Sequence, residues 1–176
     1  MQGVSAASPA FVINTGDLVS SGLRMEDWEA FFKITGDFMR NTPYYPVLGN
    51  HENDSVNYFN FFSLPGDERN YSFDWGAAHF IMLDPEGPEI SRPQAFPYGE
   101  ILRGGTHEQY LQEMMAFLRA DLDEHADAPF IFVAFHYPPY TAKSSRLEGA
   151  QEVREFFGSI FADYRVTAVL NGHDHY

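Results

Sequence analysis

The sequence predicts a layered α/β domain with mixed sheets. Short apolar stretches of strand type alternate along the chain with segments in which apolar residues recur at helical spacing, a pattern typical of α/β folds. Two of the strand-type stretches are separated only by Gly76 and Ala77, so we expect them to pair as an antiparallel hairpin. The 176 residues, 44% hydrophobic and 16% aromatic, are enough for one domain with a buried core.

The first half of the chain alternates between the two kinds of pattern. Helical spacing is clear at Trp28 and Phe31, and a period of two is clear at Tyr71, Phe73 and Trp75. The expected elements are a strand over residues 11–14, a helix over 25–39, a strand over 44–48, a short aromatic helix over 56–62, and hairpin strands over 71–75 and 78–83.

The second half begins with a stretch that has no period. Residues 85–105 contain four prolines and four glycines, which indicates a long functional loop that lies over the site. Thr106 followed by Gln109 predicts a capping box at the start of a helix. The remaining expected elements are that helix, with an apolar stripe over 111–122, a strand over 130–135, a loop over 137–149, a helix with a stripe over 153–161, and a strand over 166–170.

The charge balance excludes some classes of partner. Lysine and arginine number 11 against 25 aspartates and glutamates, a formal net charge of −14, so duplex nucleic acid and anionic membrane surfaces should be repelled. An acidic protein that handles phosphate must supply positive charge locally, and a bound metal ion is a strong local source. The chain has no cysteine, which excludes disulfides and thiolate metal sites.

The sequence carries no membrane or targeting signal. Residues 1–9 lack a basic start and an apolar run, and no later stretch is long enough to span a bilayer. We therefore expect a chain without membrane contact, and its compartment stays open.

Short polar blocks follow four of the expected strands. They are Gly16-Asp17, Gly49-Asn50-His51-Glu52, His136 and Gly172-His173-Asp174-His175. Because each block ends a strand, the side chains are expected to gather along one rim of a sheet. Carboxylates, imidazoles and an amide oxygen suit divalent metals, and a pair of such ions can activate water and hold a phosphoryl group for in-line attack. The blocks therefore predict a divalent-metal site for phosphate ester chemistry.

In this order the four blocks resemble those of the calcineurin-like metallophosphoesterases. The segments over 71–84 and 133–139 are similar to the purple acid phosphatase branch of that family. The resemblance covers nearly the whole chain and implies one calcineurin-like phosphoesterase domain over residues 1–176. It also implies a metallophosphoesterase-type α/β/β/α sandwich, in which two mixed sheets are flanked by helices.

The resemblance implies a role for each ligand-type residue. Asp17 would bridge two ions and take part in catalysis. The remaining protein ligands of one ion would be Asn50, His136 and His173, and His175 would serve the other ion. The implied cofactors are two divalent or trivalent ions of manganese, iron or zinc.

Three further residues of the blocks have implied roles around the ions. His51 would face the phosphate, where an imidazole stabilises the transition state or protonates the leaving oxygen. Glu52 and Asp174 are expected to orient imidazoles from a second layer.

The chain departs from the family pattern in three places. The purple enzymes have a tyrosine where this chain has Ser20, so a coloured Fe(III) centre is not expected and the metal identity stays open. Plant members contact phosphate through histidines after the fourth block, and here we expect Lys143 or Arg146 to make that contact. The family's first block, Asp-x-His or Asp-x-Gly, is not found before Phe11, where only a helix remnant fits.

The absent first block changes what the resemblance implies. We expect one or two ions, and a fold that is incomplete at both termini. Unpaired strand edges in such a fold would invite self-association.

The leading interpretation is metal-dependent hydrolysis of phosphate monoesters by a metal-bound hydroxide at a dinuclear-type site. Two alternatives stay open: a phosphodiesterase of the same superfamily, and a catalytically impaired remnant that binds metal or phosphate. The other histidines, His79, His107 and His125, lack support from a motif and are expected to be structural or solvated. The aromatic residues over 58–62 are expected to pack in the core.

Overall fold

The computed structural model describes residues 2–85 and 106–175. Its helices are α1 (Gln2–Ala6), α2 (Met25–Met39), α3 (Val56–Phe61), α5 (His107–Glu124) and α6 (Leu147–Asp163), with short 3-10 turns η1 (Asn50–Glu52) and η2 (Ser144–Arg146). Its strands are β1 (Val12–Asn14), β2 (Tyr44–Pro46), β3 (Tyr71–Trp75), β4 (Ala78–Met82), β5 (Phe130–Ala134) and β6 (Ala168–Leu170). The order of elements is the predicted one, and nearly all of the long loop expected over 85–105 lies outside the described residues.

Some predicted boundaries are wrong. Helix α6 begins at Leu147, inside the loop expected over 137–149, because the chain already turns helically at η2 just before it. Strand β2 ends at Pro46 instead of residue 48, although Val47 N–H still donates to Asn14 O at 2.9 Å. The last strand is also shorter than expected and starts at Ala168. Element ends are the least regular part of any strand or helix, and the types of the elements are unaffected.

The strands form two sheets. Strands β1 and β2 pair in parallel, and the second sheet has the order β3-β4-β5-β6. In that sheet β3 and β4 are antiparallel, whereas β4, β5 and β6 are parallel. The predicted hairpin is confirmed, with Trp75 opposite Ala78 and Gly76 in the turn at a φ of 61°. The prediction of mixed parallel and antiparallel pairing is therefore confirmed, and the mixed pairing lies in the four-stranded sheet.

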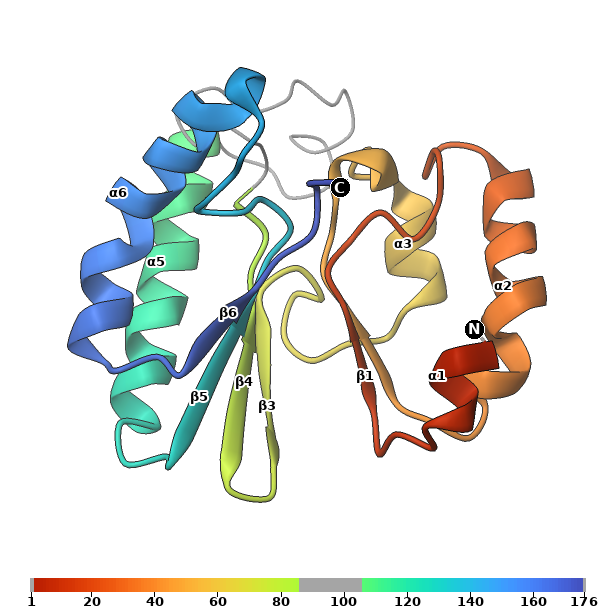
Figure 1. Ribbon diagram of the computed structural model, residues 1–176, viewed down its shortest axis with the longest axis horizontal. Coiled ribbons are helices and arrows are strands. Elements are labelled where there is room, and N and C mark those ends of the chain that lie inside the picture. Colours follow the sequence, from red (N-terminus) through yellow and green to blue (C-terminus); the bar gives the residue numbers. More distant parts are fainter. Residues whose placement is uncertain (1, 86–105, 176) are drawn as a thin grey trace.

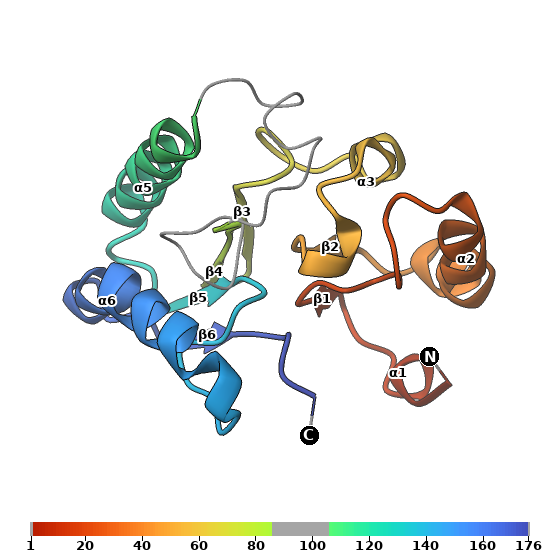
Figure 2. The same ribbon diagram turned by 90° about the horizontal axis from the view of Figure 1, so that it is seen from above.

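The two sheets face each other, and helices cover both outer sides (Figures 1 and 2). Helices α2 and α3 flank the β1-β2 sheet, while α5 and α6 flank the four-stranded sheet. Aromatic rings fill the space between the sheets: Phe73 stacks on Tyr45 of the other sheet, with ring centroids 3.8 Å apart. Phe80 stacks on Phe73 in turn, at 5.0 Å. The predicted α/β/β/α sandwich is confirmed.

An aromatic cluster holds α2 and α3 to the smaller sheet. Trp28 and Tyr58 are completely buried, and Phe31 and Phe62 pack with them. The aromatic residues over 58–62 were expected to pack, which is right for Tyr58 and Phe62, while Phe61 is 38% exposed. The amphipathic pattern of α2 thus sets which face of the helix meets the sheet.

Helices α5 and α6 pack side by side on the larger sheet. The predicted capping box begins α5: Gln109 N–H donates to Thr106 Oγ1, and Thr106 N–H donates to Gln109 Oε1. The buried helix residues on this side are Tyr110, Met114, Leu118, Leu122, Val153, Phe157 and Ile160. None of the helices within residues 2–85 and 106–175 is both long and apolar enough to cross a bilayer.

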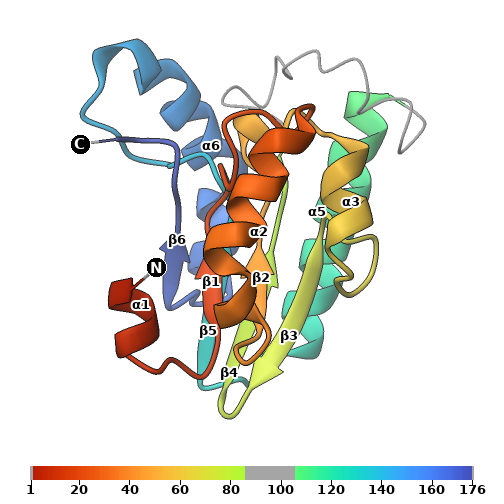
Figure 3. The same ribbon diagram turned by 90° about the vertical axis from the view of Figure 1, so that its right-hand side faces the viewer.

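The strands deliver the polar blocks to one edge of the molecule. The carboxyl ends of β1, β2, β5 and β6 all point to the upper edge in Figure 1. Strands β1 and β6 are the outermost strands of their sheets, and both lie on the same side of the sandwich (Figure 3). The loops that follow the strands can therefore meet across the top of both sheets.

Candidate metal centre

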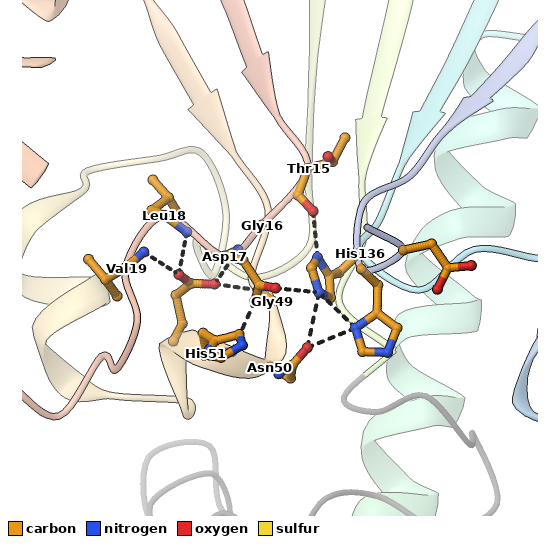
Figure 4. Close-up of polar contacts among 12 residues, drawn as sticks. Thr15, Gly16, Asp17, Leu18, Val19, Gly49, Asn50, His51 and His136 are labelled. Atoms are coloured by element: carbon orange, nitrogen blue, oxygen red, sulfur yellow. Dashed lines mark hydrogen bonds and ion pairs between the residues drawn. The ribbon is translucent and has the colours of Figure 1, made fainter. Parts of the chain in front are cut away.

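The polar blocks of the sequence meet where β1, β2, β5 and β6 end (Figure 4). Glycines allow the loops to come this close. A Cβ atom on Gly16 would lie 2.6 Å from His136 Nδ1, and one on Gly49 would lie 2.5 Å from Asp17 Oδ1. A larger residue at either position would push the loops apart, because neither neighbour is the end of a flexible chain on the surface.

Four donor atoms from these loops converge. His136 Nε2 lies 3.2 Å from Asp17 Oδ2 and 3.2 Å from Asn50 Oδ1. His173 Nδ1 lies 2.8 Å from Asn50 Oδ1 and 3.2 Å from His136 Nε2. Donors that share an ion with bonds of about 2.1 Å are themselves roughly 3 Å apart, so the spacing fits a common cation. The structure thus brings together four of the five residues expected as metal ligands.

His136 presents its free nitrogen to this point. Its Nδ1 lies 2.6 Å from Thr15 O, and because a carbonyl can only accept, Nδ1 carries the proton. Nε2 has a lone pair while the ring is neutral, which is the form that binds a cation. Burial acts to lower the pKa of His136, but its bonds to Asp17 and Thr15 prevail and raise the pKa, so a cation displaces a proton that Nε2 shares with Asp17. The side chain is 1% exposed, so the surrounding atoms hold the ring in place.

Glu52 ties the Asp17 loop to the Asn50 loop. Its buried carboxylate accepts hydrogen bonds from the backbone N–H groups of residues 17, 18 and 19 at 2.9, 2.7 and 3.3 Å, and from that of Gly49 at 2.7 Å. Within the described part of the chain these amides are its partners, so the expectation that Glu52 orients an imidazole is wrong. The two oxygens of a carboxylate accept several hydrogen bonds at once, so Glu52 can satisfy all of these backbone N–H groups. A hydrogen bond to an imidazole would use only one of those positions.

Two of the converging residues have unusual backbone conformations. Asp17 and His173 have φ values of 58° and 64°, in the left-handed region that side chains seldom adopt. Such residues persist only where surrounding bonds enforce them, and they gather at functional sites. The amides bound by Glu52 on either side of the Asp17 backbone are one such constraint.

The protonation states of Asp17 and His173 suit a cation. Burial acts to raise the pKa of Asp17, but the hydrogen bond and charge of His136 outweigh it, and the pKa lies below its ordinary value. Burial, together with His136 and Arg146, lowers the pKa of His173 to about 4. At neutral pH Asp17 is therefore a carboxylate and His173 a neutral imidazole, the forms in which both groups bind metal.

His51 and His175 lie beside the converging atoms. His51 N–H donates to Asp17 Oδ1 at 3.0 Å, and His51 Nδ1 donates to Ser20 O at 2.8 Å. Both histidines are exposed, and they line a cavity of about 620 Å³ together with Asp17. His175 is not among the atoms that converge, so the structure places it next to the centre without bringing it to the common point.

Arg146 and Asp174 bind each other at the outer side of the centre. Arg146 Nη1 donates to Asp174 Oδ1 and also to His173 O at 2.5 Å, and Thr141 Oγ1 donates to the same carboxylate. One contact of Asp174 with the His173 backbone runs through Arg146, and the expectation that Asp174 orients an imidazole stays a prediction. A role for Arg146 or Lys143 as a phosphate contact stays a prediction.

A buried ion network near the centre was missed by sequence reasoning. Arg69 is 4% exposed and forms ion pairs with Asp54 and Asp84, and its guanidinium lies 5.0 Å from the Phe59 ring centroid. Asp54 follows the Asn50 block and Asp84 follows β4, so the network fastens the loop of one sheet to the other sheet. A single arginine carries no spacing signal, and nothing in the sequence pairs it with these aspartates.

A second group of histidines and aspartates lies at the opposite end of β4. His79 is buried, with Nδ1 2.8 Å from Asp74 Oδ1 and Nε2 2.7 Å from Asp121 Oδ2. The ring of His125 stacks on it, with centroids 3.6 Å apart and planes 11° from parallel. The nitrogen lone pairs of an imidazole lie in the plane of its ring. In two stacked rings these lone pairs point along parallel planes and do not meet, so the pair is poorly arranged to share an ion. His79 therefore holds β4 to its neighbours, in agreement with the expected structural role.

Comparison with known proteins identifies the family and supports the fold. The family model for calcineurin-like phosphoesterases matches residues 2–176. The chain is 28% identical over 167 residues to an acid phosphatase of Aspergillus ficuum, which covers 77% of this chain and 26% of that protein. It is 26% identical over 163 residues to purple acid phosphatase 23 of Arabidopsis thaliana, which covers 84% of this chain and 31% of that protein. The chain therefore spans about a quarter to a third of the length of these relatives.

Solved structures share the arrangement of elements. Purple acid phosphatase PPD1 from yellow lupin (Lupinus luteus) seeds superposes with a TM-score of 0.75 at 19% identity, over 98% of this chain and 32% of that chain. GAP50, the anchor in the inner membrane complex of Plasmodium, superposes with a TM-score of 0.63 at 21% identity, over 98% of this chain and 58% of that chain. At such identities the likeness concerns the fold alone.

Proposed function

The chain belongs to the calcineurin-like phosphoesterase family and is similar to its purple acid phosphatase branch, and on that premise we propose that it hydrolyses phosphate monoesters. The observation that carries the proposal is the convergence of Asp17, Asn50, His136 and His173 on one point, beside an exposed His51. Two oxygens and two imidazole nitrogens at this spacing match the ligand set of a cation, because all four can offer a lone pair to the same point.

We propose that these four residues hold one divalent or trivalent ion, and that Asp17 and His175 serve a second ion. The family implies divalent metal ions, and mixed oxygen and imidazole ligands suit manganese, iron or zinc. When bound, such ions supply a water of lowered pKa and positive charge for the phosphoryl oxygens. That local charge is required, because the protein as a whole has a formal net charge of −14.

His51 is the proposed proton donor to the leaving oxygen. Its Nδ1 donates to Ser20 O, which orients the ring and leaves Nε2 as the nitrogen that can exchange a proton. The side chain is exposed and lines the same cavity as Asp17, so a substrate bound at the centre can reach it. Its backbone N–H donates to Asp17 Oδ1, which couples the position of the proton donor to that of the bridging carboxylate.

Lys143 stays a proposed phosphate contact. It stands at the start of η2, in the loop between β5 and α6 that also carries Arg146. An ammonium group at a partly exposed position can form a charge-assisted hydrogen bond with a phosphate oxygen. Arg146 is less suited to that task, since its Nη1 already donates to His173 O and Asp174.

One observation favours the alternative of an impaired centre. Among the described residues, the second ion would have only Asp17 and His175, and His175 lies outside the group of converging atoms. A centre with one well-held ion would still bind phosphate, but it would lack the second ion that stabilises the attacking and leaving oxygens.

Hydrolysis of para-nitrophenyl phosphate and of its bis ester, with added Mn²⁺, tests these functions. We expect the monoester to be hydrolysed at least about tenfold faster, and Asp17→Asn to abolish turnover. Asp37→Asn is the matched control, because the Asp37 side chain in α2 is 96% exposed. Faster hydrolysis of the bis ester would identify a phosphodiesterase, and tight metal binding without turnover would identify the impaired centre.

A further inference from the structure

The turn that carries His173 is held from two sides. On the inner side, Gly172 N–H donates to His136 O at 3.0 Å, and Asn171 Nδ2 donates to Phe135 O at 2.8 Å. These bonds continue the pairing of β6 with β5 up to Gly172, and one backbone bond spans His173, from Asp174 N–H to Gly172 O at 2.7 Å. His173 itself comes next, in the left-handed conformation with a φ of 64°.

The outer side is held by the loop between β5 and α6. Arg146 Nη1 donates to His173 O at 2.5 Å and to Asp174 Oδ1, and Thr141 Oγ1 donates to Asp174 Oδ2. The Asp174 side chain is 5% exposed and that of Arg146 is 32% exposed, so this ion pair is largely shielded from water. A shielded, charge-assisted pair keeps its geometry better than a surface pair does.

From these contacts we infer that Arg146 and Asp174 are positioning residues, which hold the His173 backbone in the conformation that brings Nδ1 to Asn50 and His136. Arg146 donates a hydrogen bond directly to the carbonyl of His173, and Asp174 holds the guanidinium in position. The guanidinium is thus used to shape the metal centre, in place of the phosphate contact expected from the sequence. The inference rests on the proposed metal site and concerns the order of the turn as well as ion binding.

Calorimetric titration with Mn²⁺ compares the full chain with Arg146→Ala and Asp174→Asn. Loss of residues that orient ligands lowers metal affinity by about 10- to 100-fold, and we expect a loss of that size in both variants. The double variant should lose no more than the worse single variant, because the two residues act as a unit. At saturating Mn²⁺ the KM for a small phosphate ester should stay within about twofold of the unchanged chain.

Arg154→Ala is the matched control. Arg154 Nη1 also donates to a carbonyl of the same loop, Pro139 O at 2.6 Å, but it does not reach the turn that carries His173. This variant should keep the Mn²⁺ affinity of the unchanged chain. An Arg146→Ala chain with unchanged Mn²⁺ affinity would overturn the inference. A strongly raised KM at saturating Mn²⁺ would also overturn it and would support Arg146 as a phosphate contact.

Amide hydrogen exchange without metal separates this inference from the proposed function. In Arg146→Ala, the amides of residues 173–175 should exchange faster, while those of 135–137 should not change. The control Arg154→Ala should leave both segments unchanged. If the unchanged chain binds no metal, the proposed function fails, yet faster exchange would still establish the positioning role and unchanged exchange would refute it.

Discussion

Glu52 Oε2 accepts a hydrogen bond from the backbone N–H of Asp17 at 2.9 Å, although the two residues are 35 positions apart in the chain. The same carboxylate binds the amides of Leu18, Val19 and Gly49. The loops that follow β1 and β2 are therefore one structural unit. The position of the Asp17 side chain depends on a neighbour that is no ligand itself.

Glu52→Gln should destabilise the fold and weaken metal binding together. The amide group of glutamine has only one accepting oxygen and would turn N–H donors toward backbone N–H groups. Leaving buried donors unpaired costs about 1 to 3 kcal/mol. Urea unfolding and Mn²⁺ titration of the variant check this. Glu68→Gln is the control, since that carboxylate accepts from Leu64 N–H in a more exposed loop, and an equal loss in the control would contradict the explanation.

Gly49→Ala and Gly36→Ala should have opposite effects on stability. A Cβ on Gly49 would meet Asp17 at 2.5 Å, although its φ of −113° is open to any residue, so the cost arises from the contact alone. A Cβ on Gly36 in α2 would meet nothing within 4 Å. Alanine there should stabilise the helix by about 0.5 to 1 kcal/mol, whereas overpacking at residue 49 should cost about 1 to 3 kcal/mol. Thermal unfolding measures both, and a neutral Gly49→Ala would show that the loops are not tightly packed.

His51→Ala should lower kcat by about 10²- to 10⁴-fold without weakening metal binding. The loss should be larger for alkyl phosphates than for para-nitrophenyl phosphate, because an alkoxide needs a proton to leave and a nitrophenolate does not. Rates for a series of leaving groups and a Mn²⁺ titration test this. An equal loss for all leaving groups would exclude His51 as the proton donor.

The His79 network should contribute more to the stability of the fold below the folded pKa of His79 than above it. Burial acts to lower the pKa of His79, but its bonds to Asp121 and Asp74 prevail and raise the pKa above the ordinary value. Because the folded pKa is raised, the stabilisation is fully present below the unfolded pKa of about 6.5 and is lost as the pH rises through the folded pKa.

Urea unfolding of wild type and His79→Gln across this pH range isolates the effect. The difference in unfolding free energy between the two proteins should shrink as the pH rises. A difference that is constant with pH would mean that the pKa of His79 is the same in the folded and the unfolded protein. Asp74→Asn should reduce the shift in part, since that side chain is 65% exposed and Asp121 is the more buried partner.

Arg69→Met should be strongly destabilising, whereas Arg24→Met should not. Removing the guanidinium leaves Asp54 and Asp84 buried without a cation, which typically costs about 3 to 5 kcal/mol. Arg24 pairs with Asp27 at the surface, where its side chain is 61% exposed. Urea unfolding measures both variants. A small effect of Arg69→Met would show that water or another group replaces the lost charge.

The type and order of the elements could be predicted from the sequence, because side-chain periodicity is local and reports which face of each element is buried. The convergence of Asp17, Asn50, His136 and His173 could also be expected, since each follows a strand and resembles a ligand of the family. The role of Glu52 was misjudged. Its partners are backbone amides of two loops, which the spacing of the blocks does not reveal.

By itself, the sequence determined the layered α/β fold and the polar residues offered at the strand ends. Only the tertiary structure decided how those residues are held. The Thr15 carbonyl fixes a proton on Nδ1 of His136, 121 positions away, and Arg146 donates to the His173 carbonyl, 27 positions away. The physical reason is that every residue has the same carbonyl and nearly every residue the same amide. Which of these groups meets a given side chain depends on how distant strands align in space, and no local pattern of side chains encodes that alignment.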